Sequence, residues 1–143
     1  MPFIKVYIHF VWSTKNRYPY LKMEHRHMVL EHIRANARGK AIFIDHINCH
    51  VDHVHCLLSL GIDQNLSKIV QLIKGESSYW INKQNLFKQD FAWQDEYFAV
   101  SVSESVLDRV RSYINCQDDH HRKKTFQKEY EEFMKQHGFM NLG

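Results

Sequence analysis

The sequence predicts an α+β fold, in which a ferredoxin-like antiparallel sheet carries helices on one face and is followed by C-terminal helices. Four segments alternate apolar and polar residues, the period of a β-strand, and two longer segments between them place apolar residues at helical spacing. Their order, strand, helix, strand, strand, helix, strand, is that of the split β-α-β motif. The 143 residues, 44% of them hydrophobic, suffice for one core. We therefore expect a single domain over residues 1–143.

The expected strands are bounded by turn residues or by helices. They cover residues 3–12, 41–49, 53–60 and 97–102. The second and third are close enough in the sequence to form a hairpin. In a split β-α-β sheet both crossover helices pack on one face, so we expect the other face to be free to carry a site or to bind nucleic acid.

The two crossover helices have recognisable ends. The first is expected over residues 23–38, with Gly39 as its stop. The second is expected over residues 66–84, with Asn65 as its N-cap. Gly75 interrupts the second helix at a cost of about 1 kcal/mol relative to alanine, which indicates the close approach of another group.

Two further helices are expected after the fourth strand. Ser103 is the predicted N-cap of the first, which continues to Gln117. The second is amphipathic and carries the apolar residues Phe126, Tyr130 and Phe133. These C-terminal helices extend the chain beyond the six elements of the sheet domain.

His53 and His55 alternate with apolar residues in the third strand, so they share one face of the sheet. Two imidazoles about 6–7 Å apart along a strand can converge on one metal ion. The alternative is coincidence, because the chain contains 11 histidines. Asp52, in the turn before this strand, is a candidate acceptor for an imidazole N–H or simply a turn residue.

Tyr113 and Gln117 are four residues apart on a predicted helix and therefore point the same way. Two histidines and an amide oxygen make an open, partly hard ligand set, which suits Mg²⁺ or Mn²⁺ better than structural zinc. A tyrosine is a poor nucleophile at neutral pH unless a metal polarises the phosphate it attacks. The alternative is that Tyr113 fills the apolar stripe of its helix.

The first 40 residues are strongly basic, with eight lysines and arginines against two glutamates, although the whole chain is only +3. A loop after the first strand combines the cations Lys15 and Arg17 with the aromatic Tyr18. Cations follow phosphates and aromatic rings stack on unpaired bases, so this loop suits single-stranded nucleic acid. Lys74 is a further candidate for contact with a phosphate backbone. An ordinary solvated loop and helix face are the alternatives.

Three cysteines, Cys49, Cys56 and Cys116, are odd in number and none forms a closely spaced pair. We expect them to be packing residues. The sequence contains neither a signal peptide nor an apolar segment long enough to span a bilayer. We therefore expect a cytoplasmic protein with reduced thiols and no membrane partner.

Several motifs together resemble the single-tyrosine HUH transposases of the insertion-sequence 200/605 class, which include the REP-associated tyrosine transposases. They are Asp52-His53-Val54-His55-Cys56-Leu57, Tyr113-Ile114-Asn115-Cys116-Gln117, the Phe10 to Arg17 segment, Leu66 to Ser78 around Lys74-Gly75, and Trp93 to Val102. Val51 stands where the family usually has proline and Cys56 where it usually has leucine. Neither departure removes a chemical group.

The resemblance implies a role for each site residue. His53, His55 and Gln117 would be the metal ligands, and Tyr113 the nucleophile that forms a 5′-phosphotyrosine and releases a 3′-hydroxyl. It also implies single-stranded DNA hairpin ends as substrate and a homodimer in which the tyrosine helix can complete the partner's site. Two other functions stay open: a non-catalytic nucleic-acid-binding module, and a metal-dependent hydrolase of small substrates.

Overall fold

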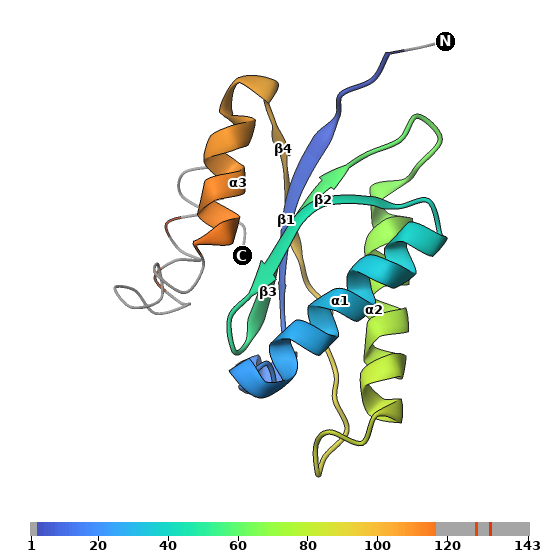
Figure 1. Ribbon diagram of the computed structural model, residues 1–143, viewed down its shortest axis with the longest axis vertical. Coiled ribbons are helices and arrows are strands. Elements are labelled where there is room, and N and C mark those ends of the chain that lie inside the picture. Colours follow the sequence, from blue (N-terminus) through green and yellow to red (C-terminus); the bar gives the residue numbers. More distant parts are fainter. Residues whose placement is uncertain (1–2, 117–127, 129–131, 133–143) are drawn as a thin grey trace.

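A four-stranded antiparallel sheet lies at the centre of the protein (Figure 1). In this computed structural model the order across the sheet is β2-β3-β1-β4, and the described residues are 3–116, 128 and 132. The strands are β1 (Tyr7–Ser13), β2 (Phe43–Cys49), β3 (His53–Ser59) and β4 (Phe98–Val102). The α+β class and the order of strands and helices are as predicted.

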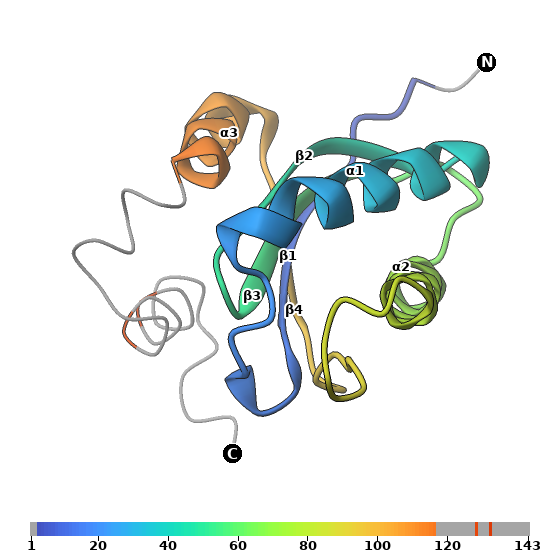
Figure 2. The same cartoon turned by 60° about the horizontal axis from the view of Figure 1, so that its bottom comes forward.

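Two helices pack on one face of the sheet and one on the other (Figure 2). Helices α1 (Met23–Gly39) and α2 (Leu66–Lys83) are the crossovers, and α3 (Leu107–Asn115) follows β4. The second face is therefore not free of helices as expected, because α3 packs on it through Leu107 and Ile114. All but the last residue of β3 are buried, since this strand lies in the middle of the sheet and is covered on both faces.

The main core lies between the sheet and the helices α1 and α2. Alternate residues of the central strands point into it, as strand geometry requires; they are Phe10, Trp12, Val54, Cys56 and Leu58. The facing side chains come from α1 and α2 and include Val29, Ile33, Ile69 and Ile73. Cys49 is also buried, whereas Cys116 is exposed, so the expectation of packing cysteines holds for two of the three.

Strand β1 begins at Tyr7 rather than at Phe3 as predicted. Tyr7 pairs with Ser59 and with Val102, which are the last residues of β3 and β4. Residues 3–6 extend past both neighbouring strands, so the ladder ends there, and the side chain of Phe3 is 99% exposed.

The predicted caps agree with the structure at the starts of the later helices. The Asn65 side chain accepts a hydrogen bond from the Lys68 N–H at 3.1 Å and starts α2. Ser103 caps a short 3-10 turn, η2 (Glu104–Val106), which leads into α3. The segment with Gln117 and the predicted helix with Phe126 lie outside the described residues.

Candidate active site

Three buried histidines come together on the face of the sheet that α3 covers. His53 and His55 lie on β3, and His9 lies on β1 beside them, because Val11 pairs with His55 and Leu57 pairs with His9. The centroids of the His53 and His55 rings are 5.2 Å apart. The His9 and His55 rings stack, also at 5.2 Å between centroids. The register of β1 against β3 thus adds a third imidazole to the predicted pair.

Each histidine of β3 has a partner that orients its ring. The Nδ1 atom of His53 lies 2.8 Å from Oδ1 of Asp52, so the Asp52 carboxylate can accept a hydrogen bond from the imidazole N–H. The turn with Asp52 is fixed to the chain just after β1, since the Thr14 N–H donates to the Asp52 carbonyl at 2.8 Å. The Nδ1 atom of His55 lies 3.0 Å from Nε2 of His9.

These contacts determine how the two rings of β3 would bind a metal. A hydrogen bond between two neutral imidazoles needs one N–H and one lone pair. If Nδ1–H of His55 donates to His9, and Nδ1–H of His53 donates to Asp52, then Nε2 on each ring is the basic nitrogen. Two orienting hydrogen bonds on Nδ1 are the usual arrangement behind metal-bound histidines. The pair therefore fits a divalent cation bound through Nε2.

Two imidazoles do not complete a metal site. Among residues 3–116 and the two other described positions, no group of three His, Cys, Asp or Glu side chains is placed to hold a metal ion. A third ligand would have to be of another chemical type or come from elsewhere. Gln117, which the sequence predicts for this position, lies outside the described residues.

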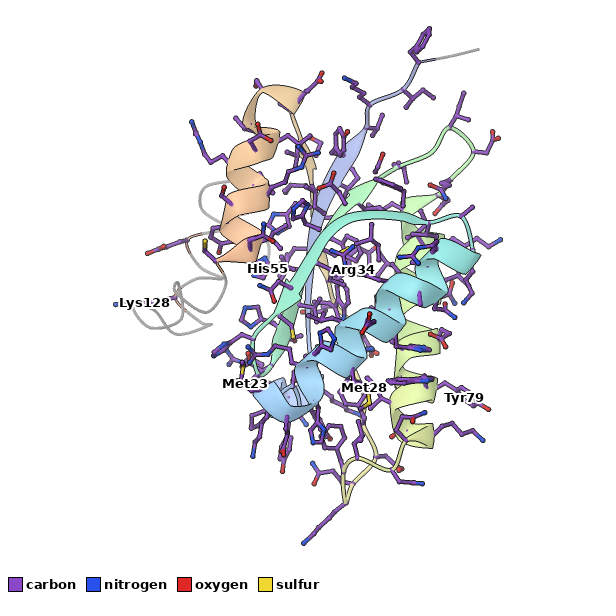
Figure 3. All side chains as sticks on the ribbon, viewed as in Figure 1. Met23, Met28, Arg34, His55, Tyr79 and Lys128 are labelled. Carbon is purple, nitrogen blue, oxygen red and sulfur yellow. The ribbon has the colours of Figure 1, made fainter. Side chains whose placement is uncertain are left out.

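Tyr113 lies beside these rings in the same chain. Its ring meets His55 edge-on, with 5.5 Å between centroids, and His9 at 6.3 Å. Helix α3 is held there by Leu107 and Ile114, which are 5% and 0% exposed and pack on Leu57 of β3. Figure 3 shows His55 between the sheet and α3. Tyr113 is half-buried, so it takes part in packing and also borders the imidazoles.

The basic loop after β1 lies at the same end of the sheet as His53. Ser13, the last residue of β1, pairs with His53, and the loop continues through the 3-10 turn η1 (Lys15–Arg17). Arg17 adopts a left-handed backbone, with φ of 54°. The side chains of Lys15, Arg17 and Tyr18 are all exposed. Their expected contact with DNA remains a prediction, but they are accessible and follow the strand end that pairs with His53.

Lys74 has a different environment, on the opposite face of the sheet. Its Nζ donates to the backbone carbonyls of Gln94 and Asp95 at 2.6 and 3.1 Å. Partial burial lowers the pKa of this ammonium from its ordinary value. Lys74 thus ties α2 to the segment before β4, and its expected contact with DNA stays a prediction that this geometry does not favour.

Gly75, the next residue, does not have the close neighbour that the sequence indicates. A Cβ atom added at Gly75 would meet nothing within 4 Å among the described residues. The glycine faces an open groove of about 460 Å³ between α2 and residues 92–97. No group of the described part of the chain therefore approaches Gly75 closely, and the expected close approach of another group stays a prediction.

Sequence reasoning missed His9. It alternates with Phe10 and Trp12 and so falls on the polar face of the first strand, yet it is 4% exposed. His9 can be identified only once β1 and β3 are paired, because the pairing puts it on the same face as His55. Local sequence does not give this register.

Comparison with known proteins identifies the family. The sequence profile of the family described as "Transposase IS200 like" matches residues 3–117, most of the chain. The chain belongs to the IS200-like transposases. It is therefore placed among enzymes that cut and transfer DNA. None of the helices within the described residues is long and apolar enough to cross a membrane.

Individual relatives agree with this assignment. The ISDra2 transposase TnpA of Deinococcus radiodurans is 27% identical over 117 residues, which are 78% of this chain and 83% of that protein. The crystal structure of a candidate transposase from the same organism has a TM-score of 0.67 at 24% identity, covering 81% of this chain and 93% of that one. A REP-associated tyrosine transposase bound to a REP hairpin has a TM-score of 0.64 at 19% identity, covering 85% and 72%. Both structures have the same fold as this chain.

Proposed function

We propose that this transposase cleaves single-stranded DNA with Tyr113 as the nucleophile and with Mg²⁺ or Mn²⁺ held by His53, His55 and Gln117. The observation that carries the proposal is the position of the Tyr113 ring, 5.5 Å from the ring of His55, which is itself 5.2 Å from that of His53. A phenol beside imidazoles that can hold a metal ion places a nucleophile next to the group that would activate the phosphate.

The proposed reaction is a transesterification. The Tyr113 oxygen, losing its proton, attacks phosphorus; the bond from phosphorus to the 3′-oxygen breaks, and that oxygen leaves as a 3′-hydroxyl after taking up a proton. The product is a 5′-phosphotyrosine, and attack by another 3′-hydroxyl reverses the step and joins the strands. Because one phosphodiester replaces another, no external energy source is needed. When bound, the metal would polarise the phosphate oxygens as a Lewis acid.

The substrate proposed is a single-stranded DNA with hairpin ends. The hairpin-bound REP-associated transposase has the same fold, which supports this choice. The exposed cations Lys15 and Arg17 and the ring of Tyr18, which is 48% exposed, would contact the unpaired strand near the scissile phosphate. Lys74 is a weaker candidate because its ammonium contacts backbone carbonyls.

The direct test is a covalent adduct. Wild-type protein incubated with Mn²⁺ and a labelled hairpin oligonucleotide carrying a single-stranded flank should form a protein–DNA adduct that survives denaturation, and chelation should prevent it. Tyr113→Phe should form no adduct and bind the oligonucleotide with about the same affinity, because only the hydroxyl is lost. Tyr79→Phe is the matched control, since Tyr79 is 63% exposed on α2 (Figure 3).

Three outcomes of this experiment would contradict the proposed function, and two of them would indicate one of the alternative functions. An undiminished adduct in Tyr113→Phe removes this residue from the mechanism. Salt-sensitive binding without any adduct or metal requirement indicates a nucleic-acid-binding module instead. Hydrolysis of small phosphate esters without DNA binding indicates a hydrolase.

We also propose a homodimer in which one subunit's tyrosine helix can complete its partner's site. Mixing a Tyr113→Phe chain with a His53→Ala chain tests this, because a shared site restores adduct formation in the mixture. Continued inactivity of a confirmed mixed dimer would confine each site to one chain.

A further inference from the structure

Helix α3, which carries Tyr113, rests on the sheet through a small apolar cluster. The fully or nearly buried members of this cluster are Leu57, Val102, Leu107 and Ile114. The main core on the other face has many more buried side chains. A short helix of nine residues with so little apolar contact needs further interactions to be held in one position.

The first of these interactions is an ion pair with the edge strand β2. Arg111 of α3 donates from Nε to Oδ1 of Asp45 at 2.9 Å and from Nη2 to Oδ2 at 2.8 Å. Such a two-bond pair fixes orientation as well as distance. The Asp45 side chain is only 10% exposed, and the Arg111 guanidinium holds the pKa of this carboxyl below its ordinary value. His46 also contacts the carboxylate.

The position of Asp45 depends on an irregularity in β2. The pairing of β2 with β3 shifts between Ile44 and His46, so Asp45 has no partner residue in the register. A bulge of this kind redirects a side chain relative to a regular strand. Here it accompanies a carboxylate that contacts α3.

The second interaction holds the C-terminal end of α3. Nδ2 of Asn48 donates to the carbonyl of Ile114 at 2.9 Å and to that of Asn115 at 3.4 Å. The last carbonyls of a helix have no partner within the helix, so Asn48 provides one from β2. The amide orientation is set by the Cys49 N–H, which donates to Oδ1 of Asn48 at 2.9 Å.

These two contacts bracket Tyr113. Arg111 precedes it by two residues, and Ile114 and Asn115 follow it, so both the rotation of α3 and its position along its axis are fixed. Asn48 is also the β2 residue that pairs with His55. One cross-strand pair therefore carries both an imidazole of the site and an anchor of the tyrosine helix.

We propose that Asp45 and Asn48 are positioning residues, which hold the helix carrying Tyr113 against the His55 and His9 rings through Arg111 and the last carbonyls of α3. The docking role stands on the contacts alone. Its consequence for DNA cleavage rests on the proposed function.

Isosteric variants test the docking directly. Asp45→Asn removes the charge that faces Arg111, and Asn48→Asp replaces the donor that faces the helix carbonyls with an acceptor while keeping the acceptor for the Cys49 N–H. The matched control is Asp108→Asn, because Asp108 also bonds Arg111, at 3.0 Å, but lies on α3 itself and is 95% exposed. Hydrogen exchange is followed by mass spectrometry on peptides from α3 and from β1 and β3.

Both variants should speed exchange in α3 by about tenfold or more, the size expected for loss of a charge-assisted or end-capping bond, with β1 and β3 unchanged. Asp108→Asn should match the wild type, and Asp45→Glu, which keeps the charge, should recover part of the protection. Wild-type exchange of α3 in both Asp45→Asn and Asn48→Asp would overturn the proposal. Equal acceleration in β1 and β3 would also overturn it, since that reports a general loss of stability.

A second measurement separates positioning from binding. At saturating DNA the rate of adduct formation should fall about tenfold or more in Asp45→Asn and Asn48→Asp, while the dissociation constant for the same DNA changes less than about twofold. Equal loss in rate and affinity contradicts a positioning role. If the wild type forms no adduct, the proposed function fails, and hydrogen exchange still decides whether Asp45 and Asn48 dock α3.

Discussion

The two faces of the sheet are held by different forces. The face under α1 and α2 is apolar, with Phe10 and Trp12 of β1 stacked at 5.0 Å between ring centroids and nearly unexposed. The face under α3 carries His9, His53 and His55, a small apolar cluster, and polar bonds to β2. One strand can serve both faces because alternate side chains point in opposite directions.

This difference separates the parts of the chain that stabilise the fold from those that carry the chemistry. Burial of large apolar side chains is the main source of folding free energy, and most of it lies under α1 and α2. The other face can therefore bury three imidazoles and can be covered by a helix whose position depends on a few polar contacts.

The largest expected effect contrasts a core residue on each face. Phe10→Ala should lower the free energy of unfolding by about 3–5 kcal/mol, as loss of a buried phenylalanine does. Ile114→Ala should lower the free energy of unfolding less, although Ile114 is 0% exposed. The reason is that α3 can detach before the sheet unfolds, so the loss cannot exceed the free energy that holds α3 on the sheet. Urea unfolding followed by tryptophan fluorescence measures both, since Trp12, Trp80 and Trp93 all belong to the α1 and α2 side.

Hydrogen exchange in α3 sharpens this comparison. It should increase in Ile114→Ala more than exchange in β1 does. Equal losses of global stability in the two variants would show that the faces unfold as one unit.

An intermediate effect is expected at His9. His9→Phe keeps a ring stacked on His55 but removes the nitrogen that bonds Nδ1 of His55, so the affinity for Mn²⁺ should fall by about 10–100-fold, the usual loss when an orienting partner of a metal ligand is removed. His9→Gln, whose amide oxygen can accept the same bond, should bind more tightly than His9→Phe. Calorimetric titration with Mn²⁺ measures this without DNA. Equal affinity in the wild type and His9→Phe would remove His9 from the support of the site.

The smallest effect is expected at Gly75. Gly75→Ala should raise the free energy of unfolding by about 1 kcal/mol, because alanine favours the helix and the added Cβ meets nothing within 4 Å among the described residues. Thermal or urea unfolding measures the gain. Unchanged affinity for hairpin DNA is expected, and a marked loss would show that the groove beside α2 contacts the substrate.

Local sequence was sufficient to predict most of the elements. Alternation placed His53 and His55 on one face, and helical spacing placed Tyr113 on a helix after the fourth strand, as the structure has them. The caps Asn65 and Ser103 were predicted because capping uses residues three or fewer positions apart. The start of β1 was not predicted, because the ladder begins only where both neighbouring strands are present.

Residue order alone predicted the strands and helices of the sheet domain. It also predicted that His53 and His55 share one strand face and that Tyr113 lies on a helix, because these placements follow from a period of two or of 3.6 residues. Only the tertiary structure decided which face α3 covers, that His9 meets His55 across 46 positions, and that Arg111 meets Asp45 across 66. Such contacts follow from strand register and from where a helix packs. Both depend on the whole chain, because burial selects one arrangement among many that are locally equivalent.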